Sequence, residues 1–152
     1  MPEKFSNELE KVLARPDAEA LAQHLDAYYS AYQKLSAGSE ASEEELNRSE
    51  PIYRASLDDP EGAFAYAVLA MANYDDEPFL YYVAAGPLED CLRRASDDVI
   101  ERVFAEARRT PRFRWMLNGV YPHAIRSDVP QRIERELGAW GDECPAPPRP
   151  WT

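Results

Sequence analysis

The sequence has little of what builds disulfide frameworks, metal centres or membrane spans. Its 152 residues include two cysteines, Cys91 and Cys144, and two histidines, His24 and His123. Two cysteines do not form a disulfide framework, and the histidines stand too far apart for a zinc-binding spacing. No run of about 18 apolar residues occurs, and the first residues include no apolar signal region. We therefore expect a cytoplasmic protein with no metal site, no cofactor and no membrane contact.

Signatures of catalysis are also missing. Glycine is scarce, with six residues, and the sequence has neither a glycine-rich phosphate loop nor a G-x-S-x-G nucleophile elbow. Cys91 stands beside Leu88 and Leu92, a position that favours a small buried hydrophobe over a nucleophile. The sequence therefore predicts a protein that is not an enzyme. An enzyme with an unrecognised site stays open, because a cysteine, a histidine and an acid can meet in the fold without being neighbours in sequence.

Positive charge is the other deficit. The chain has 28 acidic and 17 basic residues, for a net charge of -11 and an isoelectric point near 4.6. Such a surface repels the phosphates of nucleic acids and the headgroups of anionic membranes. Residues 1–100 have a net charge of -13 and residues 101–152 a net charge of +2. This asymmetry indicates either an acidic face for a basic partner or a solvated surface with acids at helix starts.

The apolar residues that are present recur at helical spacing. Residues 21–35 carry leucines and tyrosines at intervals of 4, 3, 4 and 3, which is one face of an amphipathic helix. Residues 63–72 are apolar on every side, so that segment must be surrounded by other helices and is predicted to be the most buried element. Residues 81–83 have β-propensity, so a strand there is a minor alternative.

Local signals predict where these helices begin and end. Ser42 with Glu45 three residues later forms a capping box, and Asp59 before Pro60 combines a cap with a proline in the first turn. Other expected caps are Asp17, Asp97 and Thr110. Pro51 is expected to break or kink a helix, and Gly86–Pro87 is expected to end one helix and begin another.

Together these patterns predict an all-α fold, a compact bundle or small stack of about eight short helices. Residues 1–140 form the single helical domain, and residues 141–152 form a flexible, proline-rich tail. Within that tail, the spacing of Pro147 and Pro150 fits a ligand of polyproline-binding proteins, although a plain tail is the simpler interpretation.

Residues 84–90, AAGPLED, resemble the hallmark of a family of small helical bacterial proteins of unknown function. The resemblance covers roughly residues 17–140 and implies an all-helical fold, but it implies no activity. A structural role is predicted for Gly86–Asp90, with a ligand or partner site at this turn as the alternative.

The candidate site combines the acidic clusters with a tyrosine. Tyrosine provides a large contact area at low entropic cost, and Tyr74 stands next to three acids. The residues predicted to contact a partner are Glu43, Glu44, Glu45, Asp58, Asp59, Tyr74, Asp75, Asp76 and Glu77. The function expected from them is a non-catalytic protein-binding module, in its most specific form an immunity-type inhibitor that covers a basic toxin. The alternative is a structural or adaptor subunit, which includes a homodimer.

Overall fold

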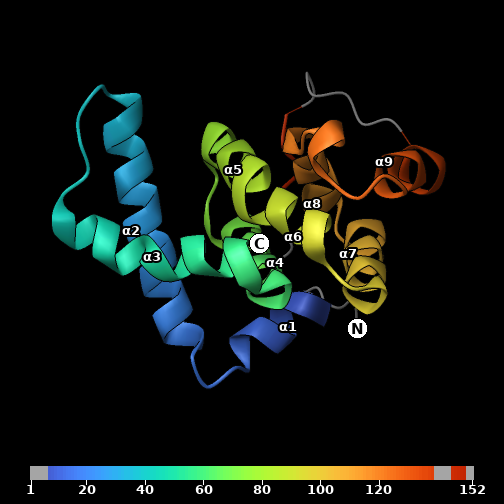
Figure 1. Cartoon of the computed structure of the whole chain (residues 1–152), viewed down its shortest axis with the longest axis horizontal. Coiled ribbons are helices and arrows are strands. Elements are labelled where there is room, and N and C mark those ends of the chain that lie inside the picture. Colours follow the sequence, from blue (N-terminus) through green and yellow to red (C-terminus); the bar gives the residue numbers. More distant parts are fainter. Residues whose placement is uncertain (1–6, 139–144, 150–152) are drawn as a thin grey trace.

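The computed structural model describes residues 7–138 and 145–149, and over these residues the chain is helical with no β-strand (Figure 1). The α-helices are α1 (Asn7–Leu13), α2 (Ala18–Ser36), α3 (Glu43–Asp58), α4 (Pro60–Asn73), α5 (Glu77–Val83), α6 (Glu89–Arg94), α7 (Asp97–Arg109), α8 (Pro111–Met116) and α9 (Val129–Arg132). Four short helical turns of other types are η1 (Ala84–Leu88), η2 (Leu117–Gly119), η3 (Pro122–Ala124) and η4 (Ile133–Leu137). The predicted all-α class is confirmed, and residues 81–83 lie in helix α5.

Helix α4 forms the centre of the molecule, as its all-round apolarity predicted. Every residue from Gly62 to Ala72 is buried, and the helix contacts α1, α2, α3, α5, α6, α7 and α8. Its alanines have no bulk beyond Cβ, so neighbouring helices can approach its axis closely. Figure 1 shows the α2–α3 pair at one end of the molecule and α7 and α9 at the other, with α4 between them.

Two of the predicted helix starts, Ser42 and Asp59, have the expected chemistry, and Asp76 adds a third cap. The Ser42 side chain accepts a hydrogen bond from the Glu45 N–H, and the Glu45 carboxylate accepts one from the Ser42 N–H, which completes the capping box. Asp59 accepts a hydrogen bond from the Gly62 N–H ahead of α4, and Asp76 does the same for Phe79 in α5. These bonds satisfy N–H groups that a helix start leaves without partners.

The interruption predicted at Gly86–Pro87 is wrong. The chain stays helical from α5 through η1 into α6, and η1 is a single π-helical turn that contains Pro87. A π-turn widens the helix by one residue, and such bulges relieve the clash and missing N–H that proline brings to an α-helix. The turn packs against α3 and α4, where Ala84, Pro87 and Leu88 are buried, while Ala85 is exposed and Gly86, Glu89 and Asp90 are partly buried.

Other local predictions need smaller corrections. Ser96, and not Asp97, caps α7 by accepting a hydrogen bond from the Val99 N–H. Asp17 precedes α2, but its side chain makes no cap hydrogen bond and its carboxylate accepts hydrogen bonds from Arg15 instead. Thr110 likewise lies at the start of α8 without capping it, and its hydroxyl donates to the Glu106 carboxylate.

Helix α3 continues through Pro51, so the chain does not break at this proline. Near that proline the Ser49 hydroxyl donates to the Glu45 carbonyl at 2.8 Å.

Part of the expected tail lies against the helical body. The described residues 145–149 contact the start of α5 and the first turn of α8 through three hydrogen-bonded positions, Ala146, Pro147 and Arg149. Residues 139–144 and 150–152, which include Cys144 and Pro150, lie outside the described residues.

We expect Gly119→Ala to lower the free energy of unfolding by about 2 kcal/mol, because the site has no room for a methyl group. A Cβ at Gly119 would lie 2.7 Å from the Tyr81 ring, 2.9 Å from the Ala84 Cβ and 3.2 Å from the Tyr81 backbone. The matched control is Gly86→Ala, whose Cβ would meet only the Tyr28 hydroxyl, at 3.2 Å, and should change stability by less than about 1 kcal/mol. Urea unfolding measures both. Equal stability of the two variants would contradict the close packing of η2 on α5.

Candidate protein-binding surface

The structure places the nine predicted contact residues in three groups. Residues 43–45 begin α3, residues 58 and 59 join α3 to α4, and residues 74–77 join α4 to α5. The first and third groups both contact α2, since Glu45 accepts hydrogen bonds from Ser30 and Lys34 while Tyr74 donates one to Asp26. The first and third groups therefore lie against the same helix.

Most of these acids already have partners within the fold. Lys34, Ser30 and the Ser42 N–H bind the Glu45 carboxylate and lower its pKa to about 2. Glu44 forms an ion pair with Arg48 at 2.7 Å. Asp59, as described above, caps α4. Glu45 and Asp59 therefore serve to begin helices α3 and α4, and Glu44 stabilises α3 through an ion pair.

The acids near α5 are engaged as well. Asp76 caps that helix and accepts a 2.9 Å hydrogen bond from the Tyr29 hydroxyl. Asp75 pairs with Arg112 and Arg149, and mainly the bonds from Arg149 lower its pKa. Glu77 accepts a hydrogen bond from the Ala146 N–H.

Tyr74 is half-buried rather than a free anchor. Its ring packs edge-on against Tyr29 and Phe79, with centroids 4.8 and 5.0 Å away. Burial, together with the hydrogen bond to Asp26, raises the pKa of its hydroxyl.

At the α2–α3 end of the molecule, three exposed acids have no ion-pair partner among the described residues. Glu43 and Asp58 belong to the predicted set, and Glu40 in the α2–α3 loop was not singled out by the sequence. Residues 38–58 contain six acids and two arginines, a net charge of -4. The α2–α3 end therefore carries exposed negative charge that no described cation neutralises.

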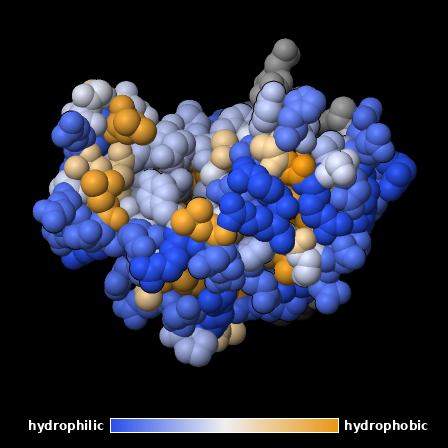
Figure 2. All heavy atoms as spheres, viewed as in Figure 1, coloured by the Kyte–Doolittle hydropathy of each residue, from blue (hydrophilic) through white to orange (hydrophobic). Residues whose placement is uncertain are grey.

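A groove of about 340 Å³ opens beside these acids, between α2, α3 and α5. Its lining is mostly aromatic and aliphatic, and it consists of Tyr28, Ala31, Tyr32, Leu35, Ser39, Glu40, Ala41, Leu46, Tyr53 and Tyr82. We call this set the tyrosine groove. Figure 2 shows apolar side chains exposed over the α2–α3 pair, at the left of the molecule. Leu35, Leu46 and Tyr53 are 64%, 50% and 46% exposed.

The tyrosine rings of the groove hold one another in place. The Tyr28 ring packs edge-on against Tyr53, with the ring centroids 5.6 Å apart. The Tyr82 ring is tilted against both Tyr28 and Tyr32, with centroid distances of 5.4 and 4.8 Å. Burial is the main cause that raises the pKa of Tyr53 to about 12, so its hydroxyl stays protonated and able to donate. Because these ring contacts exist before any partner arrives, fewer side chains need to be ordered on binding, which reduces its entropic cost.

Sequence reasoning missed this groove. The tyrosines of residues 21–35 were predicted only to share one face of an amphipathic helix with leucines, and the structure buries Tyr28 but leaves Tyr32 half-exposed on the groove wall. A usable signal did exist on α3, where Leu46, Tyr53 and Leu57 follow at intervals of 7 and 4. That spacing marks one helix face, and all three side chains are exposed.

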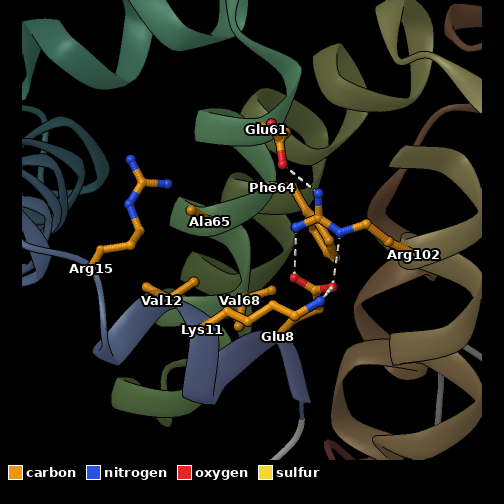
Figure 3. A pocket seen from close by; sticks show the side chains of 9 residues that line it. All are labelled: Glu8, Lys11, Val12, Arg15, Glu61, Phe64, Ala65, Val68 and Arg102. Atoms are coloured by element: carbon orange, nitrogen blue, oxygen red, sulfur yellow. Dashed lines mark hydrogen bonds and ion pairs between the residues drawn. The ribbon is translucent and has the colours of Figure 1, made fainter. Parts of the chain in front are cut away.

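A second cavity, of about 240 Å³, lies between α1, α4 and α7 (Figure 3). Figure 3 shows the Arg102 guanidinium between Glu8 and Glu61, with the Phe64 ring beside it. Arg102 donates to both oxygens of Glu8, at 3.0 and 2.9 Å, and to Glu61. Lys11 adds a contact to Glu8 at 3.4 Å. The Glu8 and Glu61 carboxylates already bind Arg102, the cation at the centre of this cavity. These ion pairs form a clamp that fastens α1 to the core.

Comparison with known proteins bears on the tyrosine groove. The model of DUF6869, a family of unknown function, matches residues 37–139. The chain belongs to this family. No curated protein and no solved structure matches the chain. The matched DUF6869 region contributes Leu46, Tyr53 and Tyr82 to the groove, while α2 contributes the opposite wall from residues that precede that region.

Among the described residues of the DUF6869 chain, the cysteine and both histidines lie outside the groove lining. Cys91 is fully buried, and burial raises the pKa of its thiol to about 12, so the thiolate nucleophile is suppressed. His24 is half-buried, with Nδ1 2.8 Å from the Tyr66 hydroxyl, and desolvation lowers its pKa. His123 is exposed and packs edge-on against Tyr121.

The described ranges, 7–138 and 145–149, contain neither a metal-binding cluster nor a membrane-spanning helix. No three or more His, Cys, Asp or Glu side chains lie close enough there to hold a metal ion. None of the helices formed by these residues has the length and apolarity needed to cross a membrane.

Proposed function

We propose that this DUF6869 protein is a non-catalytic binding module that captures a basic partner protein at its tyrosine groove. The observation that carries the proposal is a preformed, partly exposed aromatic groove with unpaired carboxylates on its rim. An immunity-type inhibitor that neutralises a basic toxin is the specific form of this function that fits a small acidic chain.

The groove has the composition of a protein interface. Aromatic side chains are enriched in such interfaces, and tyrosine combines a broad apolar face with a hydroxyl that can bond to a partner. Leu46 and Tyr53 project from α3 on the side that also carries the exposed Leu57, so the apolar surface extends along that helix. A partner helix or loop that covers this face would bury side chains that are now in water.

The charge at this end of the molecule selects for a basic partner. Glu40 lies in the groove lining and Glu43 begins the adjoining helix, and neither has an ion-pair partner among the described residues. A lysine or arginine could therefore reach a free carboxylate while its alkyl part or guanidinium lies over a tyrosine ring. Long-range attraction by the net charge of -11 would accelerate encounter.

A homodimer through the same face is the second candidate. The exposed face of α3, with Leu46, Tyr53 and Leu57, favours it because a second copy could cover these side chains. Like charges at the rim oppose it, since two copies would bring Glu40 and Glu43 together.

The test compares proteins that bind to the immobilised chain in a lysate of the native host. We expect a basic protein to be captured by the wild type and at least tenfold less by the double variant Leu46→Asp, Tyr53→Ala, because these changes remove the exposed apolar contacts. The control is Leu13→Asp, which alters an exposed leucine of α1 outside the groove lining. Capture that the groove variant leaves unchanged would contradict the proposal.

The rate of association with the purified partner tests whether the acids at the groove attract it. Glu40→Lys with Glu43→Lys should slow association by about an order of magnitude at low salt and by much less at 0.5 M salt. Asp98→Lys with Glu134→Lys makes the same charge change elsewhere and should have a smaller effect. Light scattering of wild type and groove variant decides the alternative: a dimer that the groove changes dissociate would favour the homodimer.

A further inference from the structure

A different site joins the α4–α5 turn to the first turn of α8. Its centre is Arg112, which is 3% exposed. The Arg112 guanidinium donates through one terminal nitrogen to the Tyr74 carbonyl at 2.6 Å and to the Asp75 carboxylate at 3.0 Å. These bonds fix its direction, and its other terminal nitrogen points toward the surface segment that covers the site.

That covering segment is the chain's own residues 145–149, Pro-Ala-Pro-Pro-Arg. The remaining terminal nitrogen of Arg112 donates to the Pro147 carbonyl at 3.0 Å. The Ala146 N–H donates to the Glu77 carboxylate at 3.1 Å, and Ala146 packs against the core. The site thus forms hydrogen bonds with the backbone of this segment at two successive residues, Ala146 and Pro147.

Arg149 adds a side-chain contact. Its guanidinium donates two parallel hydrogen bonds to the two oxygens of Asp75, at 2.9 and 2.6 Å. Paired bonds of this kind require a planar fork and so discriminate arginine from lysine. Asp75 lies between two arginines, and either one alone would leave its carboxylate less fully bonded.

The bound segment is well suited to be a ligand. Three of its five residues are prolines, which hold an extended conformation before binding and so lose little entropy on binding. A donor aimed at a proline carbonyl and an acid paired with a nearby arginine are sufficient to recognise such a segment and its direction.

We propose that Tyr74, Asp75, Glu77 and Arg112 form a binding site for extended Pro–Pro–Arg segments, which residues 145–149 occupy in the same molecule. A partner protein that presents a segment of this chemistry would displace them. Residues 145–149 belong to the same molecule, so they compete with a partner's segment for the site at a high effective concentration. A partner can therefore displace them only if it is abundant or makes a second contact with the protein. This inference is independent of the tyrosine groove, which shares no residue with it.

The test measures binding of a fluorescent peptide with the sequence of residues 145–150, PAPPRP, to the full chain. In the variant Arg149→Glu, repulsion from Asp75 releases the internal segment, and we expect the peptide to bind at least tenfold more tightly than to the wild type. Arg135→Glu, which alters an exposed arginine outside the site, should leave the weak wild-type binding unchanged.

Two changes show whether Asp75 recognises the arginine side chain of the peptide. The peptide PAPPEP, which needs no further protein variant, should bind Arg149→Glu at least tenfold more weakly than PAPPRP. Adding Asp75→Asn to Arg149→Glu should reduce PAPPRP binding to a similar extent, with circular dichroism reporting the fold. The proposal is overturned if PAPPRP does not bind Arg149→Glu, if it binds the wild type equally well, or if PAPPEP binds as tightly.

Discussion

Replacing Leu69 by aspartate is expected to lower the free energy of unfolding by about 4–5 kcal/mol, a large share of the total stability of a domain of this size. Leu69 is 2% exposed in the middle of α4, which other helices surround. An aspartate there would either remain charged without a partner or take up a proton at a cost in free energy. The neighbouring Val68 is a poorer choice, because it lines the cavity that holds Lys11 and Arg15.

Two further variants isolate the cause of this loss. Leu57→Asp makes the same change on α3 at a side chain that is 65% exposed, and it should alter stability by less than about 0.5 kcal/mol. Leu69→Ala creates only a cavity and should cost about 3 kcal/mol. Urea unfolding followed by far-UV circular dichroism measures all three. If Leu69→Asp were no less stable than Leu69→Ala, the buried charge would not be the cause.

Replacing Arg102 by methionine is expected to cost about 3 kcal/mol at pH 7, because it leaves the Glu8 carboxylate buried with Lys11 as its remaining cation. Glu8 is 6% exposed and anchors α1 to α7. Methionine keeps much of the length and apolar contact of the arginine stem, so the loss reports the ion pair. The control is Arg54→Met, which breaks an exposed pair with Glu50 and should cost less than about 0.5 kcal/mol.

The pH dependence of stability distinguishes an ion pair of Arg102 with Glu8 from simple packing. Burial by itself would raise the pKa of Glu8, but the hydrogen bonds and charge of Arg102, with Lys11, outweigh burial and lower that pKa. In the wild type, Glu8 therefore contributes stability above the ordinary glutamate pKa, and the contribution is lost as the pH falls through the lowered value. Without Arg102, burial dominates and raises the pKa, so the variant suffers a penalty at neutral pH that protonation relieves.

The stability difference between wild type and Arg102→Met should consequently be largest near pH 7 and shrink towards about pH 4. Thermal unfolding at several pH values measures it. A difference that is constant over this range would mean that Arg102 acts through packing, and the clamp in Figure 3 would not be an electrostatic one.

Predictions about single helices succeeded where the signal was local and unambiguous. The capping box of Ser42 and Glu45 needs only residues three apart, and the apolar segment 63–72 could be stable only inside a bundle. At Asp97 the signal was local but ambiguous, because Ser96 beside it caps equally well and the register of α7 decides between them.

The predictions that failed depended on distant residues. Gly86–Pro87 has the composition of a helix stop, yet packing against α3 and α4 makes a continuous π-turn more favourable there. The acidic turn at Asp75 looked like an open surface, but Arg112 and Arg149 reach it from 37 and 74 residues away. A sequence alone does not show which charges such long-range contacts will pair.

The sequence by itself determined that this protein is all-helical, acidic and centred on one apolar helix, because helix periodicity and caps are set by residues within a few positions of each other. Only the tertiary structure decided which acids are free and where the tyrosines meet. The tyrosine groove brings together Tyr28, Tyr53 and Tyr82, and the Pro–Pro–Arg site brings together Asp75, Arg112 and Arg149. Both sites arise from the way the helices pack, and packing is a property of the whole chain.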